Sequence, residues 1–174
     1  VVADERGAAA GLGPLTRRRG DPDAGVHRAA RGRGSAASDE LRALTPKGRA
    51  DVAKLAETLA RKGVHVAEVW HSSLRRAAET ARILVDAGRI GSDVQERDGL
   101  LPEDDPAEIV EALELMYDDV CIVGHMPFVS SLVSMLIAGR AQSIVRFETA
   151  TMACLEREAL GAWRLAWQLS PAIL

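Results

Sequence analysis

The sequence contains few of the features that mark membrane, secreted or disulfide-rich proteins. Only two of its 174 residues are cysteines, and nothing resembles a disulfide framework or a metal site. No apolar run reaches the ~20 residues of a membrane-spanning helix. No apolar segment follows a basic start, so we predict no signal peptide. A net charge of -3 gives no reason to expect nucleic acid or a membrane as a partner. These absences favour a cytoplasmic enzyme.

What the sequence does contain is typical of one folded domain. Hydrophobic residues make up 47% and charged residues 27% of the chain, and a chain of this length can bury a substantial core. Cys121 and Cys154 both lie in apolar, strand-like runs, so we predict that they are buried free thiols.

Residues 1–38 differ from the rest of the chain. They consist mainly of Ala, Gly, Arg and Pro and show no apolar periodicity. Such a segment buries too little surface to offset the entropy lost on ordering. We therefore predict an irregular or disordered segment over residues 1–38 and a folded domain over residues 39–174. One interpretation of the segment is a basic tail that touches an acidic partner.

From Ser38 onwards, helical and strand patterns alternate. Thr45 and Pro46 are typical of a helix N-cap and first helical residue, and Gly63 is typical of the end of that helix. Further helices are predicted over residues 74–87, 106–116 and 128–137, and strands over residues 64–70, 120–124, 144–147, 151–156 and 163–169. This order predicts an α/β three-layer sandwich with a mostly parallel sheet flanked by helices.

Trp163 and Trp167 occupy alternate positions in the last predicted strand. Strict alternation would place both side chains on one face of the sheet, and we predict a mainly structural role for them. The alternative is that the pair forms a docking surface for a partner.

His125 directly follows the apolar run Val120–Gly124, and Pro127 starts the next predicted helix. In open α/β sheets, ligands bind beyond the carboxyl ends of the strands, and the free N–H groups of a helix start favour an anion. His125 is therefore a candidate anion-binding residue. The alternative is a buried structural histidine held by a hydrogen bond.

A second strand end has the same layout. Ser72 follows the predicted strand, and Arg76 lies in the first turn of the next helix. The helix dipole opposes a cation there, so an arginine in this position often helps to bind an anion, and its guanidinium can pair with two phosphate oxygens. The alternative is a surface arginine that pairs with Glu79 or Asp51. His71 is predicted to pack against or cap the strand end.

Together these motifs resemble those of the histidine phosphatase superfamily. The matching residues are Ser72-x-x-x-Arg76-Ala77-x-x-Thr80-Ala81 and Gly124-His125-x-Pro127, with Leu44-Thr45-Pro46-x-Gly48, Leu101-Pro102 and a Trp-rich C-terminal hairpin. Their order and spacing over residues 38–174 are similar to those of the small, SixA-type phosphohistidine phosphatases.

The resemblance implies a phosphoglycerate mutase-like fold and a reaction in two steps. Family members transfer a phosphoryl group to a histidine in an Arg-His-Gly motif at the end of the first strand, and water then hydrolyses the phosphoenzyme. Arg76 and His125 match the family's second arginine and second histidine. The resemblance therefore implies catalytic roles for both, and substrate binding by Arg76, His125 and Ser72. It implies no metal or other cofactor, because these side chains supply the positive charge.

The substrate that the resemblance implies is a phosphorylated histidine on a signalling or phosphotransfer protein. Some relatives also use a carboxylic acid to protonate the leaving group, and Glu103, Asp104 and Asp105 lie in the corresponding loop. A phosphohistidine needs little such help, because imidazole leaves readily.

The chain departs from the family at the nucleophile. It contains no Arg-His-Gly motif, and no β-rich run precedes Leu44. His27 is the one histidine of the N-terminal segment, and its neighbours do not fit the motif. We therefore expect the first strand of the sheet to be absent or abnormal, and the chain as written to be inactive and poorly stable.

One hypothesis is that residues 1–38 include an out-of-frame translation. Ala, Gly, Arg and Pro dominate the shifted frames of GC-rich genes. With a permitted choice of codons for residues 27–34, reading one base later gives Ile-Val-Arg-His-Gly-Asp-Ala, at a suitable distance before Leu44.

Three functions remain open from the sequence. The first is a SixA-like phosphohistidine phosphatase. The second is a small-molecule phosphatase or mutase of the same superfamily, although the short chain leaves little room for a lid over a small substrate. The third is a non-catalytic phosphate-binding module that has lost its nucleophile.

Overall fold

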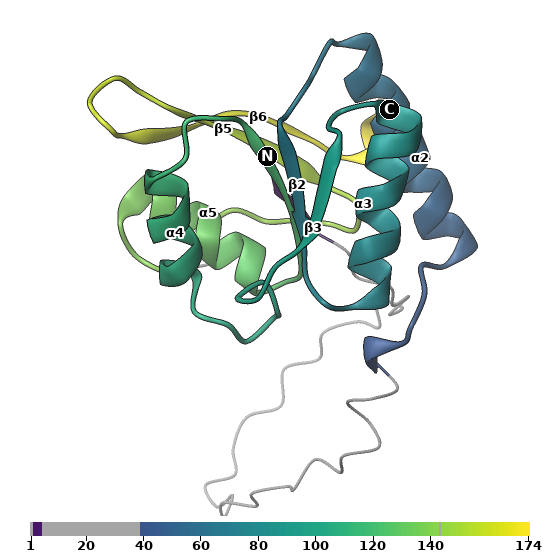
Figure 1. The fold of residues 1–174 in the computed structure, drawn as a ribbon, viewed down its shortest axis with the longest axis horizontal. Helices are drawn as coiled ribbons and strands as arrows, with labels where there is room; N and C mark the ends of the chain where they lie inside the picture. The colour runs from purple at the N-terminus through teal and green to yellow at the C-terminus, as the bar shows by residue number, and fades with distance from the viewer. Residues whose placement is uncertain (1, 5–38, 143) are drawn as a thin grey trace, which may run out of the picture.

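The computed structural model describes residues 2–4, 39–142 and 144–174 (Figure 1). The described strands form one six-stranded sheet in the order β3-β2-β4-β1-β5-β6. In chain order they are β1 (Val2–Asp4), β2 (Glu68–His71), β3 (Asp93–Glu96), β4 (Val120–Gly124), β5 (Met152–Arg157) and β6 (Trp163–Leu169). The helices are α2 (Pro46–Arg61), α3 (Arg75–Gly88), α4 (Pro106–Glu114), α5 (Phe128–Ala138) and the short 3-10 helix η1 (Pro171–Ile173).

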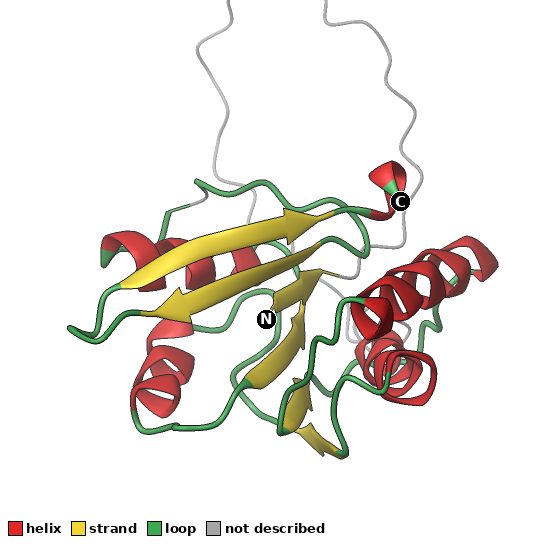
Figure 2. Cartoon of the chain, turned by 90° about the horizontal axis from the view of Figure 1, so that it is seen from above, coloured by secondary structure: helices red, strands yellow, loops and turns green. Residues whose placement is uncertain are grey.

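The sheet lies between two layers of helices (Figure 2). β3, β2, β4 and β1 run parallel, whereas β5 is antiparallel to both β1 and β6. α2 and α3 pack together over one face, where Val69 and Cys121 are buried. α4 and α5 cover the other face, where Trp70 and Ile122 are buried. The predicted α/β three-layer sandwich is therefore confirmed.

Local sequence signals account for both ends of α2. The Thr45 side chain caps the helix by accepting a hydrogen bond from the Gly48 N–H at 3.0 Å, as predicted. Pro46 begins the helix, where its missing N–H costs nothing. Gly63 lies just beyond the last turn with a φ of 67°, a conformation that glycine adopts without a steric penalty.

β4 crosses the middle of the sheet and is buried along its whole length. Burial on both faces is typical of a parallel strand covered by helices, and it explains the continuous apolar run. Gly124 is the last residue of the strand, and the position requires glycine because a Cβ here would lie 2.9 Å from Cγ1 of Val129 in α5. The chain therefore passes from β4 almost directly into α5, with His125 between them.

Within residues 1–38 the structure describes one short strand, β1. Val2–Asp4 pairs in parallel with the end of β4 and antiparallel with the start of β5. We expected the first strand to be absent or abnormal, and the strand that the structure describes in this place is only three residues long. Its place is decided by pairing with two strands that are distant in the chain. His27 and residues 27–34, on which the reading-frame hypothesis depends, lie outside the described residues.

Two further strand predictions differ from the structure. Residues 144–147 form no strand, because serines of α5 satisfy their backbone groups: the Ile144 N–H donates to Ser134 Oγ at 3.2 Å, and Ser130 Oγ donates to the Val145 carbonyl at 2.6 Å. β3, which the sequence does not predict, is a polar edge strand with partly exposed residues. Such a strand has low intrinsic propensity and depends on pairing with β2.

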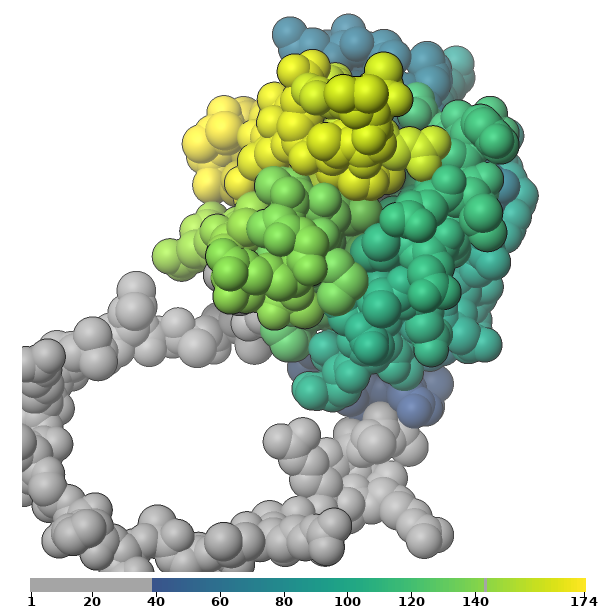
Figure 3. Space-filling view, turned by 90° about the vertical axis from the view of Figure 1, so that its left-hand side faces the viewer, coloured from purple at the N-terminus to yellow at the C-terminus, as the bar shows by residue number. Residues whose placement is uncertain are grey.

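Trp163 and Trp167 lie on the hairpin formed by β5 and β6, which packs beside α5 (Figure 3). Both are half-buried and pack against the core, which supports a structural role. The prediction of a shared face is wrong, because Trp163 packs on the α4–α5 side and Trp167 on the α2–α3 side. A register shift between Cys154 and Leu155 places an extra residue in β6 and reverses the alternation beyond it.

Burial of the two cysteines agrees only partly with the prediction. Cys121 on β4 is fully buried on the sheet face that α2 and α3 cover, whereas Cys154 is half-buried. Among the described residues, no helix is both long enough and apolar enough to cross a membrane.

Candidate anion-binding site

Ser72 and His125 meet at the carboxyl edge of the sheet. β2 and β4 are parallel neighbours in which His71 pairs with Val123, so the residues that follow the two strands lie side by side. Ser72 Oγ and His125 Nε2 are 2.6 Å apart and share a hydrogen bond. Both residues are buried, with 0% and 2% of their surface exposed. The structure therefore brings together two of the three residues that the sequence predicts for the site.

Ser72 also connects this pair to the start of α3. The Leu74 N–H donates to Ser72 Oγ at 3.4 Å, and the Ser72 N–H donates to the Val123 carbonyl at 3.4 Å. Leu74 is the N-cap of α3 and offers no side-chain acceptor to the first helical N–H groups. An uncapped helix start of this kind is favourable to an anion.

Arg76, the third predicted residue, is buried in the first turn of α3 and only 5% exposed. Its guanidinium pairs with neither Glu79 nor Asp51. Nη2 donates to the Asp39 carboxylate at 3.2 Å and Nη1 donates to the Asp39 carbonyl at 3.0 Å. Convergence of Arg76 and His125 on one bound anion stays a prediction.

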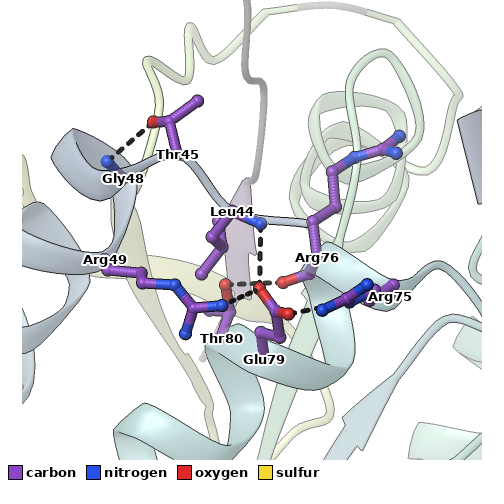
Figure 4. Close-up of polar contacts among 8 residues, drawn as sticks. All are labelled: Leu44, Thr45, Gly48, Arg49, Arg75, Arg76, Glu79 and Thr80. Carbon is purple, nitrogen blue, oxygen red and sulfur yellow. Dashed lines mark hydrogen bonds and ion pairs between the residues drawn. The ribbon is translucent and has the colours of Figure 1, made fainter. Parts of the chain in front are cut away.

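The neighbouring Arg75 behaves as a surface arginine, and it forms part of a network around Glu79 (Figure 4). The Glu79 carboxylate accepts a hydrogen bond from the Leu44 N–H at 2.9 Å. It also pairs with Arg49 at 2.6 Å and with Arg75 at 2.9 Å. The network ties the segment before α2 to α3, while the Arg76 side chain points away from it (Figure 4).

The electrostatic balance keeps Glu79 charged. Burial of the carboxyl group acts to raise its pKa, but the Leu44 N–H and the Arg75 and Arg49 guanidinium groups outweigh it, and the pKa lies below its usual value. Within the same helix, Thr80 Oγ1 donates to the Arg76 carbonyl at 2.9 Å.

The remaining candidate residues have local structural contacts. His71 Nδ1 donates to the Ser72 carbonyl at 2.8 Å, in agreement with the prediction that it caps the strand end. Asp104 Oδ2 accepts from the Leu101 N–H at 2.7 Å, and Asp105 Oδ1 accepts from the Ala107 N–H at 3.0 Å and caps α4. Two of the three loop acids therefore shape the loop itself.

A hollow of about 550 Å³ lies at the opposite end of the sheet, between β4 and β5. Asp119, Cys154 and Trp163 are among its lining residues. It forms because β1 pairs only with the last part of β4 and the first part of β5. Since neither Ser72, Arg76 nor His125 lines it, the hollow is not part of the candidate site.

A hydroxyl and an imidazole, from Ser72 and His125, lie together at the carboxyl edge of the sheet, and the buried Arg76 guanidinium lies in the first turn of the adjacent α3. A hydroxyl and an imidazole can donate hydrogen bonds and a guanidinium carries positive charge, so groups of these types suit a tetrahedral oxyanion such as a phosphoryl group. Over the described parts of the chain, no group of three His, Cys, Asp or Glu residues is arranged to hold a metal ion.

Part of the chain is similar to a known protein family. Residues 27–101 match the family model of the histidine phosphatase superfamily, branch 1.

Individual proteins are similar to this chain in sequence or in fold. The chain is 27% identical over 143 residues to the phosphohistidine phosphatase SixA of Escherichia coli strain K12, covering 80% of this chain and 88% of that protein. The structure of the protein histidine phosphatase SixA complexed with tungstate is similar with a TM-score of 0.72 and 26% identity, covering 79% of this chain and 89% of that one. A phosphoserine phosphatase of Entamoeba histolytica has the same fold at 13% identity, with a TM-score of 0.58 and coverage of 79% and 92%.

Sequence reasoning missed Asp39 as a residue of the site. It lies at the point where the patterned part of the chain begins, and no periodicity or motif connects it to Arg76. The two residues are 37 positions apart, so only the folded chain shows the contact.

Proposed function

We propose that this domain binds the phosphoryl group of a phosphorylated histidine on a signalling or phosphotransfer protein, and that its site is built for the SixA-type phosphatase reaction. The observation that carries the proposal is the 2.6 Å contact between Ser72 Oγ and His125 Nε2 at the carboxyl edge of the sheet. Arg76, a buried cation, lies in the first turn of the adjacent α3. The relative from Escherichia coli, a phosphohistidine phosphatase by name, supports the choice of substrate.

In the proposed complex, the phosphoryl group lies beyond the ends of β2 and β4. Arg76 balances the charge on the phosphoryl oxygens. The hydrogen bond between His125 Nε2 and Ser72 Oγ opens, so that both side chains can donate hydrogen bonds to these oxygens. Phosphoryl transfer depends mainly on positioning and on positive charge near the equatorial oxygens, and these three side chains would supply both.

The covalent steps require a nucleophile in addition to this binding site. In the family's reaction, a nucleophilic histidine takes the phosphoryl group from the substrate imidazole, and water then releases it as inorganic phosphate. The substrate imidazole is a good leaving group, so the reaction needs little help from an acid. Because this sequence has no Arg-His-Gly motif, we expect the chain as written to bind phosphate without turnover.

The missing motif favours a second candidate function, a non-catalytic phosphate-binding module. A small-molecule phosphatase or mutase of the superfamily is the remaining alternative. The phosphoserine phosphatase of Entamoeba histolytica gives it no direct support, because 13% identity relates the two proteins by fold alone.

Binding is tested by titrating inorganic phosphate into the full chain in a calorimeter. We expect Arg76→Ala and His125→Ala each to weaken binding by at least about tenfold, the loss of one charge-assisted hydrogen bond. Arg75→Ala is the matched control, since Arg75 is the adjacent, half-exposed arginine and pairs with Glu79. Equal phosphate affinity in the Arg76→Ala and Arg75→Ala proteins would refute the proposed site.

Turnover is measured as phosphate release from a phosphohistidine protein, from phosphoserine and from a sugar phosphate. Release from the phosphohistidine protein alone would support the SixA-type activity. Release from either small molecule would support the small-molecule alternative. Binding without release from any substrate is the result expected for the chain as written, and it would support the binding module.

A further inference from the structure

The Arg76 guanidinium already holds an anion that belongs to the chain itself. Nη2 donates to Asp39 Oδ2 at 3.2 Å, and Nη1 donates to the Asp39 carbonyl oxygen at 3.0 Å. A carboxylate oxygen and a phosphoryl oxygen make the same kind of contact with a guanidinium. Asp39 therefore takes a position on Arg76 that a phosphoryl oxygen would take in the proposed function.

The carboxylate contact is one that a stronger anion can displace. The Arg76 side chain is 6% exposed, whereas that of Asp39 is 46% exposed, so one partner is fixed and the other faces solvent. A single Nη2–Oδ2 distance of 3.2 Å is long for a charge-assisted hydrogen bond. In addition, Arg76 Nε is buried and has no hydrogen-bond partner among the described residues. The guanidinium thus has donor capacity that Asp39 does not use.

Arg42 is placed to receive the displaced carboxylate. Its Nη2 lies 3.3 Å from Asp39 Oδ1, on the other oxygen of the same carboxyl group. The Arg42 N–H also donates to the Asp39 carbonyl at 3.2 Å, which keeps the two residues together. When Oδ2 leaves Arg76, the carboxylate keeps a cationic partner at the surface.

The backbone around Asp39 does not have to move for this exchange. At the far end of the segment, Leu44 is bonded to Glu79 and Thr45 caps α2. At the near end, the Asp39 carbonyl accepts from Arg76 Nη1 independently of the carboxylate. A rotation of the Asp39 side chain is enough to free Nη2.

We propose that Asp39 is an internal competitor that sets the affinity of the Arg76 site for phosphate, and that Arg42 takes its carboxylate when phosphate binds. The inference rests on the proposed function, because it requires phosphate to bind at Arg76. Asp39 neutralises the guanidinium, so a bare phosphate gains less from that charge. A phosphoprotein makes further contacts with the domain, so its affinity depends less on the charge of Arg76.

The test is the affinity of the full chain for inorganic phosphate in the Asp39→Asn variant, which keeps the side-chain shape and removes the charge. We expect affinity to rise about two- to fivefold, the range for a partly exposed ion pair. Asp51→Asn is the matched control, because it removes the same charge from a pair with Lys47, and it should leave the affinity unchanged. Arg42→Ala should lower the affinity, and this loss should be smaller in the Asp39→Asn background.

Four other outcomes would overturn the inference, and one of them would also overturn the proposed function. Weaker binding in Asp39→Asn would overturn the inference and make Asp39 a residue that positions the guanidinium. An equal gain in Asp51→Asn would also overturn it, since net charge would then explain the effect. Binding that depends on Arg76 but does not change in Asp39→Asn would overturn this inference alone. Binding that does not depend on Arg76 would overturn the proposed function as well. Thermal unfolding of each variant checks that its fold is retained.

Discussion

Replacing Glu79 with glutamine should destabilise the protein by an amount that the Glu79 network predicts. Glutamine keeps the size of the side chain and removes its charge. The carboxylate pairs with Arg49 and Arg75, whose side chains are 47% and 57% exposed, so each pair contributes about 0.2–1 kcal/mol. The hydrogen bond from the Leu44 N–H loses about 1 kcal/mol more when its acceptor becomes neutral.

The expected loss of unfolding free energy at pH 7 is therefore about 1.5–3 kcal/mol. For a protein of this size, that loss lowers the Tm by about 3–12 °C. The assay is thermal and urea unfolding of the two proteins, followed by circular dichroism. Glu57→Gln is the control, because Glu57 is an exposed glutamate on α2 and the same charge is removed.

The pH dependence of this difference has a definite sign. The pKa of Glu79 is lower in the folded protein than its ordinary value of 4.5. Its contribution to stability is therefore fully present above the unfolded pKa, and it is lost as pH falls through the folded pKa. The difference between wild type and Glu79→Gln should be constant above about pH 5.5 and should shrink below about pH 4.5. A difference no larger than that of Glu57→Gln, or one that grows on acidification, would refute the reasoning.

Three further predictions concern catalysis, the reading frame and the thiols. In an active form of the protein, Arg76→Ala should reduce turnover by about 10²–10³, as on removal of one oxyanion donor, and a near-normal rate would contradict its assignment. Sequencing the gene should reveal an insertion or deletion between the codons for Gly34 and Ser38; an uninterrupted frame would show that the N-terminal segment is real. The frame-corrected protein should be more stable and should hydrolyse phosphohistidine. Burial raises the pKa of Cys121 to about 11, so a thiol reagent at pH 8 should modify Cys154 first, and preferential labelling of Cys121 would contradict its burial.

Where contacts between distant segments decided the local structure, the sequence patterns predicted the wrong structure or predicted none. Alternation placed Trp163 and Trp167 on one face, but a register shift in the β5–β6 ladder separates them. The polar residues of β3 carry no strand signal and become a strand because β2 offers a parallel edge. Residues 144–147 have strand-like composition, yet two serine side chains of α5 take up their backbone groups instead.

The sequence also determined some features of the candidate site, and only the tertiary structure decided the others. The sequence by itself determined that Ser72 and His125 would follow strands and precede helices, and parallel pairing of those strands makes two such positions neighbours. It also determined that a cation, Arg76, would stand in the first turn of α3, because the helix start is visible in the residue pattern. Only the tertiary structure decided that the charge on Arg76 is met by Asp39. That pairing joins residues 37 positions apart, and no local preference of either residue encodes it, since an ion pair depends on where the fold places both charges.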